Sequence, residues 1–219
     1  KMKRILITGV NSYVGNSLEE WLSQYPEKYE VHKISLRNGT WRSKDLSRYN
    51  VVVHVAGIAH RKENKDLYYK INRDLTHELA VKSKKEGVSH FIFLSSMSVY
   101  GMETGIITKQ TEPQPKSHYG KSKLQAEKMI WSLNEETFKI AILRPPMIYG
   151  QGCKGNYVRL SKLATKLPFF PNVTNKRSMI YIDNLSEFIR FLINDLKEGI
   201  YYPQNDDYVT TSKMVKEIA

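Results

Sequence analysis

An apolar run followed by a glycine-containing turn stands at the start of the chain and constrains its fold more than any other feature. Residues 4–15 read Arg-Ile-Leu-Ile-Thr-Gly-Val-Asn-Ser-Tyr-Val-Gly, which predicts a buried strand, a tight turn and the start of a helix. Gly9 permits the sharp turn, and Gly15 permits close packing of the helix on the strand. The backbone amides at the start of such a helix can hold a pyrophosphate. Ser12 stands where turns of this kind usually carry another glycine, so its side chain narrows the space for the phosphates.

Short apolar runs alternate with longer amphipathic stretches through most of the chain. This alternation is typical of successive βα units, so we expect an α/β fold with a doubly wound parallel sheet. The expected strands lie near residues 4–8, 31–36, 51–55, 90–95 and 139–144. The expected helices lie near residues 14–25, 66–86, 119–135, 156–167 and 183–197.

The chain changes character after Pro145 and Pro146, where glycines and prolines become frequent. We interpret the residues that follow as a smaller lobe laid over the open end of the sheet. The main domain is then expected to comprise residues 1–150 and 178–198, and the C-terminal lobe residues 151–177 and 199–219. Residues 210–217 have the pattern of a capped helix that is just starting, so we expect the lobe to be incomplete and to continue beyond Ala219.

The chain of 219 residues carries a formal charge of +12, from 34 Lys and Arg against 22 Asp and Glu. Such an excess is compatible with nucleic-acid binding or with a small phosphate-bearing ligand. The basic residues are spread along the chain, and no run alternates them with aromatic residues as a stacking platform for nucleic acid would. We therefore expect a solvated basic surface with a phosphate-binding cleft, and no nucleic-acid partner.

Several classes of protein are disfavoured by what the sequence lacks. No apolar run approaches the roughly 20 residues that span a bilayer, so we expect no membrane span. The first expected strand follows the N-terminus directly, so we expect no signal peptide. A single cysteine, Cys153, excludes an internal disulfide framework and fits a reducing cytoplasm. The six histidines show no ligand spacing with cysteines or carboxylates, so we expect no metal.

The second expected strand bears on the choice between two dinucleotides. Units that bind NAD usually carry an acid at the end of this strand, where it meets the ribose hydroxyls. Here residues 31–36 run into Arg37, and no acid occurs between Val31 and Lys44. An arginine at this place suits the 2′-phosphate of NADP, whereas the alternative is a solvated arginine on a loop. The pattern favours NADP.

Tyr119 and Lys123 stand four residues apart in an expected helix and therefore share one of its faces. A phenol has a reference pKa of about 10, so it transfers protons at neutral pH only when a nearby cation lowers that pKa. Lys123 can supply this cation. Ser96 and Ser98 follow the strand at residues 90–95, at the sheet edge where ligands bind. A lone Tyr–Lys pair also occurs on solvated helix faces. Here the glycine turn and the strand followed by serines, which precede the pair in the sequence, favour the catalytic interpretation.

Five segments occur in the order and spacing found in the extended short-chain dehydrogenase/reductases: TGVNSYVG, VVVHVAG, FLSSMSVYG, YGKSK and LRPPMIYG. The chain resembles this family over nearly its whole length. Within the family it looks like the branch of NAD(P)-dependent nucleotide-sugar epimerases, dehydratases and 4-ketoreductases. The resemblance implies a Rossmann-type sheet and a small C-terminal substrate-binding lobe. It also implies a homodimer that pairs helices such as residues 66–86, with Tyr68 and Tyr69 at the interface.

The resemblance further implies which residues form the site. Ser96, Tyr119 and Lys123 match the family's catalytic set. The residues implied to bind the cofactor NAD(P) are Thr8, Gly9, Asn11, Ser12, Tyr13, Val14, Gly15, Arg37, Asp45, Leu46, Val55, Ala56, Gly57, Asn72, Tyr119, Lys123 and Pro146. Among these, Asp45 and Leu46 match the segment that contacts adenine in the family.

Two later segments, residues 152–157 and 175–183, resemble segments that bind nucleotide sugars, and a UDP-sugar is the favoured substrate. The implied substrate-binding residues are Ser98, Met147, Asn156 and Arg177. Arg177 lies where the family places an arginine on the diphosphate, and the alternative for it is a surface ion pair. Met147 replaces the asparagine that many of these epimerases carry. The pattern looks closer to reductases of 4-keto-hexosamine nucleotides than to the galactose epimerase.

These features indicate an enzyme that acts at C4 of a nucleotide-linked sugar, as a 4-keto reductase or as a 4-epimerase. Both reactions use the same three catalytic residues, so the sequence leaves both open. A dehydratase is disfavoured because the serine segment lacks the adjacent Asp–Glu pair that elimination needs. The alternative from another class is a non-catalytic NAD(P)-sensing regulatory protein of the same fold.

Overall fold

The computed structural model describes residues 2–59, 64–102, 104–153 and 177–208. The helix expected at residues 156–167, the substrate-binding candidate Asn156 and the helix start expected at 210–217 lie outside these residues. Among the described helices, none is long and apolar enough to cross a membrane.

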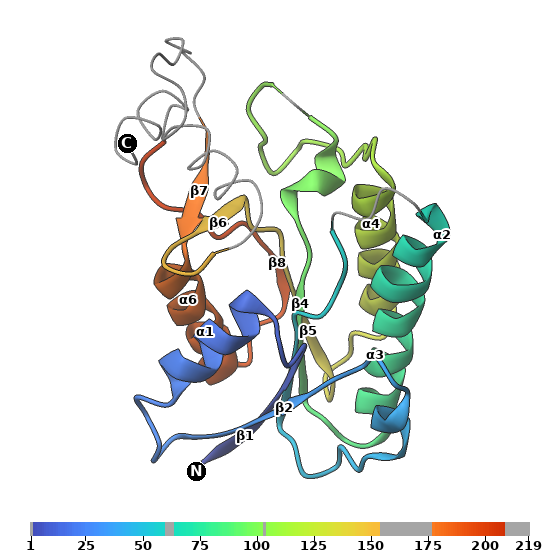
Figure 1. Cartoon of the computed structure of the whole chain (residues 1–219), viewed down its shortest axis with the longest axis vertical. Helices are drawn as coiled ribbons and strands as arrows, with labels where there is room; N and C mark the ends of the chain where they lie inside the picture. The colour runs from blue at the N-terminus through green and yellow to red at the C-terminus, as the bar shows by residue number, and fades with distance from the viewer. Residues whose placement is uncertain (1, 60–63, 103, 154–176, 209–219) are drawn as a thin grey trace.

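Six parallel strands form the central sheet in the order β2-β1-β3-β4-β5-β8 (Figure 1). The strands are β1 (Lys3–Thr8), β2 (Tyr29–Ile34), β3 (Val51–His54), β4 (His90–Leu94), β5 (Lys139–Leu143) and β8 (Gly199–Tyr201). The strand order reverses at β1, which has β2 on one side and β3 on the other. In sheets of this kind, ligands bind beyond the carboxyl ends of the strands at such a switch point. The predicted α/β fold with a doubly wound parallel sheet is confirmed.

Helices cover both faces of the sheet (Figure 1). One face carries α1 (Tyr13–Leu22) and α6 (Ile182–Asp195), which contact each other. The other face carries α2 (Lys65–Tyr68), the π-helical segment η2 (Tyr69–Asp74), α3 (Leu75–Lys85) and α4 (His118–Trp131). Two short 3₁₀ segments, η1 (Thr40–Ser43) and η3 (Met97–Tyr100), follow β2 and β4.

The strands divide their side chains between two cores. Ile5 and Ile7 of β1 pack with apolar residues of α1 and α6, whereas Leu6 between them packs with residues of α3 and α4. Successive side chains of a strand point to opposite faces, so a strand that is buried on both faces has a continuous apolar run. This is why the inner strands were recognisable in the sequence.

Three strands of three residues each were not predicted. β6 (Met147–Tyr149) and β7 (Met179–Tyr181) form a separate two-stranded parallel sheet. β8 pairs with the end of β5, so residues 199–201, which the sequence assigns to the C-terminal lobe, lie in the main sheet. Three residues are too few to show a periodicity, and the glycine at the start of β8 has the pattern of a break. The rest of the division into a domain and a lobe stays a prediction.

The packing of α1 on the sheet can be tested at Leu18, which is fully buried in the core shared with α6. We expect Leu18→Ala to lower the free energy of unfolding by about 3 kcal/mol, because the substitution leaves a cavity in a close-packed core. Urea denaturation measures the difference. Glu20→Ala, at an exposed position of the same helix, is the control. Equal effects of the two substitutions would contradict the packing described here.

Candidate active site

The glycine turn after β1 has the close approaches that its sequence predicts. Gly9 has φ of 89°, and a Cβ atom there would lie 3.2 Å from Cβ of Ser12 and 3.4 Å from Cα of Ala56. A Cβ atom on Gly15 would lie 3.2–3.3 Å from atoms of Ile7, Gly9 and Val55. The expected close packing of the helix on the strand at Gly15 is therefore confirmed.

Ser12, the departure from the usual glycine pattern, is the N-cap of α1. Its hydroxyl accepts a hydrogen bond of 3.3 Å from the backbone N–H of Gly15. The amides of Tyr13 and Val14, in the first turn, have no acceptor within the helix. They remain available to an anion, which the positive end of the helix dipole also favours. The turn therefore fits the phosphates of a dinucleotide despite the serine.

The turn after β3 joins the glycine turn to the interior of the site. The backbone N–H of Ala56 donates to the Thr8 hydroxyl over 3.2 Å. A Cβ atom on Gly57 would lie 3.0 Å from Oδ1 of Asn72 and 3.3 Å from Nζ of Lys123. A glycine is thus what allows these two side chains to approach the turn. The expected cofactor residues of β1 and β3 therefore lie beside the expected catalytic lysine.

Asn72 is fully buried and clamps the backbone next to that turn. Its amide accepts from the N–H of Ile58 and donates to the carbonyl of Ile58, both over 2.9 Å. It also donates to the hydroxyl of Ser122, which donates in turn to the carbonyl of Tyr119. Asn72 lies in the π-helical segment that interrupts the helix expected over residues 66–86. Such wide turns are frequent at functional sites, and a regular helical periodicity does not reveal them.

A buried histidine that the sequence did not single out connects this region to β1. Nδ1 of His54 lies 2.7 Å from the Thr8 hydroxyl, and Nε2 lies 2.8 Å from the Thr76 hydroxyl. The Thr76 hydroxyl donates to the carbonyl of Asn72, so we infer that His54 carries its proton on Nε2. Burial, with a smaller effect of the Lys123 charge, lowers the pKa of His54 to about 3, which keeps the ring neutral.

Lys123 is buried, and its ammonium donates to the carbonyl of Leu94 at the end of β4 over 2.9 Å. The ammonium also lies 4.7 Å from the ring centre of Phe93. Burial lowers the pKa of Lys123 to about 8, although the nearby carboxylate of Glu127 acts in the opposite direction. The lysine is therefore mostly charged at neutral pH.

Tyr119 occupies the first turn of α4, which Ser117 caps by accepting from the N–H of Gly120 over 3.0 Å. Burial raises the pKa of Tyr119, and the hydrogen bond with Ser96 partly offsets this rise. The sequence predicts the opposite direction, a pKa lowered by Lys123. Burial is the largest cause here, and the ammonium of Lys123 donates to the Leu94 carbonyl instead.

The serine segment, residues 95–98, follows the end of β4 and lies beside the start of α4. Ser96 is the N-cap of η3, accepts from the N–H of Ser98 and donates to its hydroxyl, both over 3.1 Å. A Cβ atom on Gly120 would lie only 2.4 Å from the carbonyl oxygen of Ser98. The glycine lets α4 press against this segment. The structure thus brings Ser96, Ser98, Tyr119 and Lys123 together beyond the carboxyl ends of β3 and β4.

Other expected site residues lie outside this cluster. Arg37 is exposed after β2, and Arg177 is exposed just before β7. Asp45 is exposed and accepts from the N–H of Ser47 over 2.9 Å. The side chain of Leu46 is buried in the core shared with α3 and α4. Pro146 lies between β5 and β6, Met147 is the first residue of β6, and both are partly buried.

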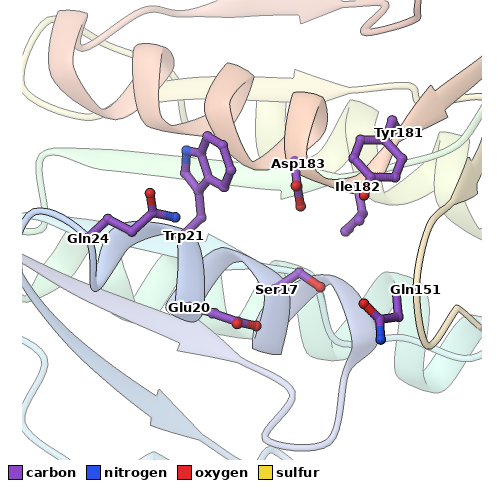
Figure 2. Close-up of a pocket in the computed structure, with 8 residues that line it drawn as sticks. All are labelled: Ser17, Glu20, Trp21, Gln24, Gln151, Tyr181, Ile182 and Asp183. Atoms are coloured by element: carbon purple, nitrogen blue, oxygen red, sulfur yellow. The ribbon is translucent and has the colours of Figure 1, made fainter.

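A separate hollow of about 490 Å³ lies between α1 and α6 (Figure 2). It is lined by Ser17, Glu20, Trp21, Gln24, Gln151, Tyr181, Ile182 and Asp183. None of these is among the individually named site candidates, although Tyr181, Ile182 and Asp183 end the segment 175–183 that resembles a nucleotide-sugar-binding segment. The carboxylates of Glu20 and Asp183 disfavour a phosphate-bearing ligand. Within the described residues, no group of three His, Cys, Asp or Glu side chains could hold a metal ion.

Comparison with known proteins decides the family. Residues 5–204 match the model described as the NAD dependent epimerase/dehydratase family. The chain belongs to this family. Its resemblance to the extended short-chain dehydrogenase/reductases is thereby confirmed.

Two curated relatives are epimerases by name. The UDP-glucose 4-epimerase of Vibrio cholerae is 32% identical over 246 residues, which cover 99% of this chain and 75% of that protein. The N-acetyl-alpha-D-glucosaminyl-diphospho-ditrans,octacis-undecaprenol 4-epimerase of Escherichia coli O157:H7 is 29% identical over 225 residues, covering 98% of this chain and 67% of that protein.

Solved structures share the fold. The UDP-glucuronic acid 4-epimerase of Bacillus cereus, in complex with NAD, superposes with a TM-score of 0.83 at 22% identity and covers 98% of this chain and 82% of that one. The dTDP-4-dehydrorhamnose reductase of Bacillus anthracis, in complex with NADP, has a TM-score of 0.82 at 22% identity and covers 100% of this chain and 80% of that one. Proteins of this fold have thus been solved with NAD and with NADP.

The approach of α4 to the serine segment can be tested at Gly120. We expect Gly120→Ala to lower the free energy of unfolding by about 1–3 kcal/mol, because the new methyl group would overlap a backbone oxygen and force a shift. Urea denaturation measures the change, and Lys121→Ala, at the next and exposed position, is the control. Stabilisation by Gly120→Ala, as expected for a glycine in an open helix position, would contradict this close approach.

The burial of Lys123 generates a stability prediction with a defined pH range. The pKa of about 8 lies below the usual value of 10.5, so between these pH values the unfolded chain binds a proton that the folded chain does not. Stability therefore rises from about pH 8 to pH 10.5, and the full penalty of about 3 kcal/mol applies below pH 8. Lys123→Met removes the penalty and loses a hydrogen bond worth about 1 kcal/mol, so we expect a net gain of about 2 kcal/mol at pH 7.

Urea denaturation of Lys123→Met at pH 7 and at pH 10 measures this gain and its loss at higher pH. Lys121→Met, exposed on the same helix turn, should show neither effect. A Lys123→Met protein that is less stable than the unaltered chain at pH 7 would show that the buried ammonium carries no net penalty.

Proposed function

We propose that the protein is an NAD(P)-dependent oxidoreductase acting at C4 of a nucleotide-linked sugar, by 4-keto reduction or by 4-epimerisation. The observation that carries the proposal is the proximity of Tyr119 to Ser96 at the carboxyl edge of the sheet, one helical turn from Lys123. The lysine in turn lies beside Gly57, at the turn next to the phosphate-binding start of α1.

Each of the three side chains has a distinct task in this proposal. A bound nicotinamide supplies the hydride to the sugar carbon or accepts it. The Tyr119 hydroxyl gives a proton to the C4 oxygen during reduction and takes it during oxidation. Ser96 donates a hydrogen bond that orients this oxygen, and the ammonium of Lys123 favours the phenolate electrostatically.

The protonation state of Tyr119 bears on the direction of the reaction. Burial raises the pKa of its phenol, so the hydroxyl is protonated at neutral pH. Reduction of a 4-keto sugar requires this protonated state. Epimerisation begins with removal of a proton from the sugar hydroxyl, which requires the positive charge of Lys123 to act on the phenol. The proposal includes both reactions, because both curated relatives named above are 4-epimerases.

Features at the rim of the site support finer parts of the proposal. Arg37 is exposed just after β2, where it is free to meet the 2′-phosphate of NADP. Arg177 is exposed before β7 and is proposed to bind the diphosphate of a UDP-sugar. In a proposed homodimer, Tyr68 and Tyr69 lie at the interface, and within the single chain their hydroxyls bond Ala59 and His118.

The proposal is tested by a binding and turnover screen of NAD and NADP with UDP-, dTDP- and GDP-sugars. A reductase consumes NADPH in proportion to product, whereas an epimerase returns the cofactor unchanged. With the substrate in hand, we expect Tyr119→Phe to lower kcat by about 10²- to 10⁴-fold, because the proton donor is lost. Cofactor affinity should remain within about twofold, since the phosphate-binding turn is untouched.

Two outcomes would contradict the proposal in different ways. Full turnover by Tyr119→Phe would remove Tyr119 from the chemistry. Tight dinucleotide binding without turnover of any nucleotide sugar would favour the regulatory sensor instead. Tyr69→Phe is a matched control, because it removes a tyrosine hydroxyl that bonds only His118 among the described contacts.

A further inference from the structure

A buried ion pair lies directly beneath the candidate site. Arg144, just after β5, and Glu127, in α4, are 4% and 3% exposed. Nη2 of Arg144 donates to Oε2 of Glu127 over 2.6 Å, and Nε of Arg144 lies 3.1 and 3.2 Å from the two carboxylate oxygens. The guanidinium also donates to the hydroxyl of Tyr100, in η3, over 2.7 Å.

The same carboxylate holds the end of β4. The Ser95 hydroxyl donates to Oε1 of Glu127, and the Ser95 N–H donates to the carbonyl of Leu143 over 2.7 Å. Ser95 directly precedes Ser96. One carboxylate on α4 therefore binds groups that follow β4 and β5, and Ser95 adjoins Ser96, which acts on the pKa of Tyr119.

Helical spacing places this carboxylate in line with the candidate catalytic residues. Tyr119, Lys123 and Glu127 follow one another at intervals of four residues and so share one face of α4. Fixing Glu127 against Ser95 therefore fixes the face that carries the phenol and the ammonium.

Packing alone does not account for such a pair. The desolvation of two buried charges offsets much of their attraction, and an apolar pair of similar volume is often as stable. What an apolar pair lacks is directional hydrogen bonds to a neighbouring strand end. The polar contacts of Glu127 and Arg144 thus specify geometry rather than stability.

We propose that Ser95, Glu127 and Arg144 are positioning residues that hold the Ser96 hydroxyl against Tyr119 and keep α4 in register with the ends of β4 and β5. The proposal rests on the catalytic roles proposed above for Ser96 and Tyr119. It also predicts that Glu127 raises the pKa of Lys123.

The groups that face Lys123 come from several elements: Glu127 and Tyr119 from α4, His54 from β3, Asn72 from η2 and the Leu94 carbonyl from β4. Among these groups, His54 is neutral and Glu127 carries the negative charge that acts on the ammonium. Glu127→Gln should lower the pKa of Lys123 below about 8 and move the alkaline limb of the pH–rate profile to lower pH.

The most specific variant is Ser95→Ala, which keeps the ion pair and removes only the hydrogen bond from the Ser95 hydroxyl to the Glu127 carboxylate. Its control is Ser83→Ala, another buried serine whose hydroxyl donates to a carbonyl inside α3, away from the site. We expect hydrogen exchange of the peptide around residues 96–100 to rise about tenfold in Ser95→Ala and not in Ser83→Ala. We expect kcat to fall about tenfold with KM within twofold.

A second variant separates positioning from folding. Glu127→Met combined with Arg144→Met should retain the fold, because both members of the ion pair are removed and neither is left buried without the other, yet show the same faster exchange and lower kcat. If both variants exchange like Ser83→Ala, the positioning role is overturned. If exchange rises while Tyr119→Phe keeps full turnover, the positioning role stands and the proposed function is the part that fails.

Discussion

The contact of α4 with the carboxyl ends of β4 and β5 is the interaction on which the candidate site depends. Three successive turns of α4 each make this contact in a different way. Gly120 presses on the Ser98 carbonyl, Lys123 donates to the Leu94 carbonyl, and Glu127 accepts from Ser95. The first contact requires a missing side chain, and the other two require charged ones. All three act on the helix that carries Tyr119, so together they define where its phenol lies.

This arrangement carries a cost in stability. The ammonium of Lys123 is buried, and burial lowers its pKa to about 8 although the Glu127 carboxylate acts in the opposite direction. The charges of Glu127 and Arg144 are also withdrawn from water, although they satisfy each other. An unpaired buried charge destabilises the folded state strongly, whereas in a buried ion pair the mutual attraction nearly offsets the loss of hydration. The penalty is therefore concentrated on Lys123, the residue whose charge the proposed chemistry uses.

The sequence predicts the parts of this structure that local pattern controls. The continuous apolar runs of β3 and β5 mark strands buried on both faces, and their bounds agree within one or two residues. Gly15 is predictable because helix and strand lie a few residues apart. The Ser95–Glu127–Arg144 network is not, since its members are separated by 32 and 17 positions and meet only through the tertiary fold. The direction of the pKa shift of Tyr119 cannot be predicted from the sequence for the same reason, because burial in the tertiary fold, and not the spacing to Lys123, decides it.

The states of the two candidate proton-holding groups, taken together, define how the site begins a reaction. The raised pKa of Tyr119 keeps its phenol neutral, and a pKa of about 8 keeps Lys123 mostly charged at neutral pH. A protonated donor beside a cation is ready to stabilise negative charge that develops on a carbonyl oxygen. For the reverse transfer, the phenol must lose its proton while the ammonium keeps its own. The carboxylate of Glu127, which opposes the effect of burial on Lys123, therefore favours the proposed oxidative direction.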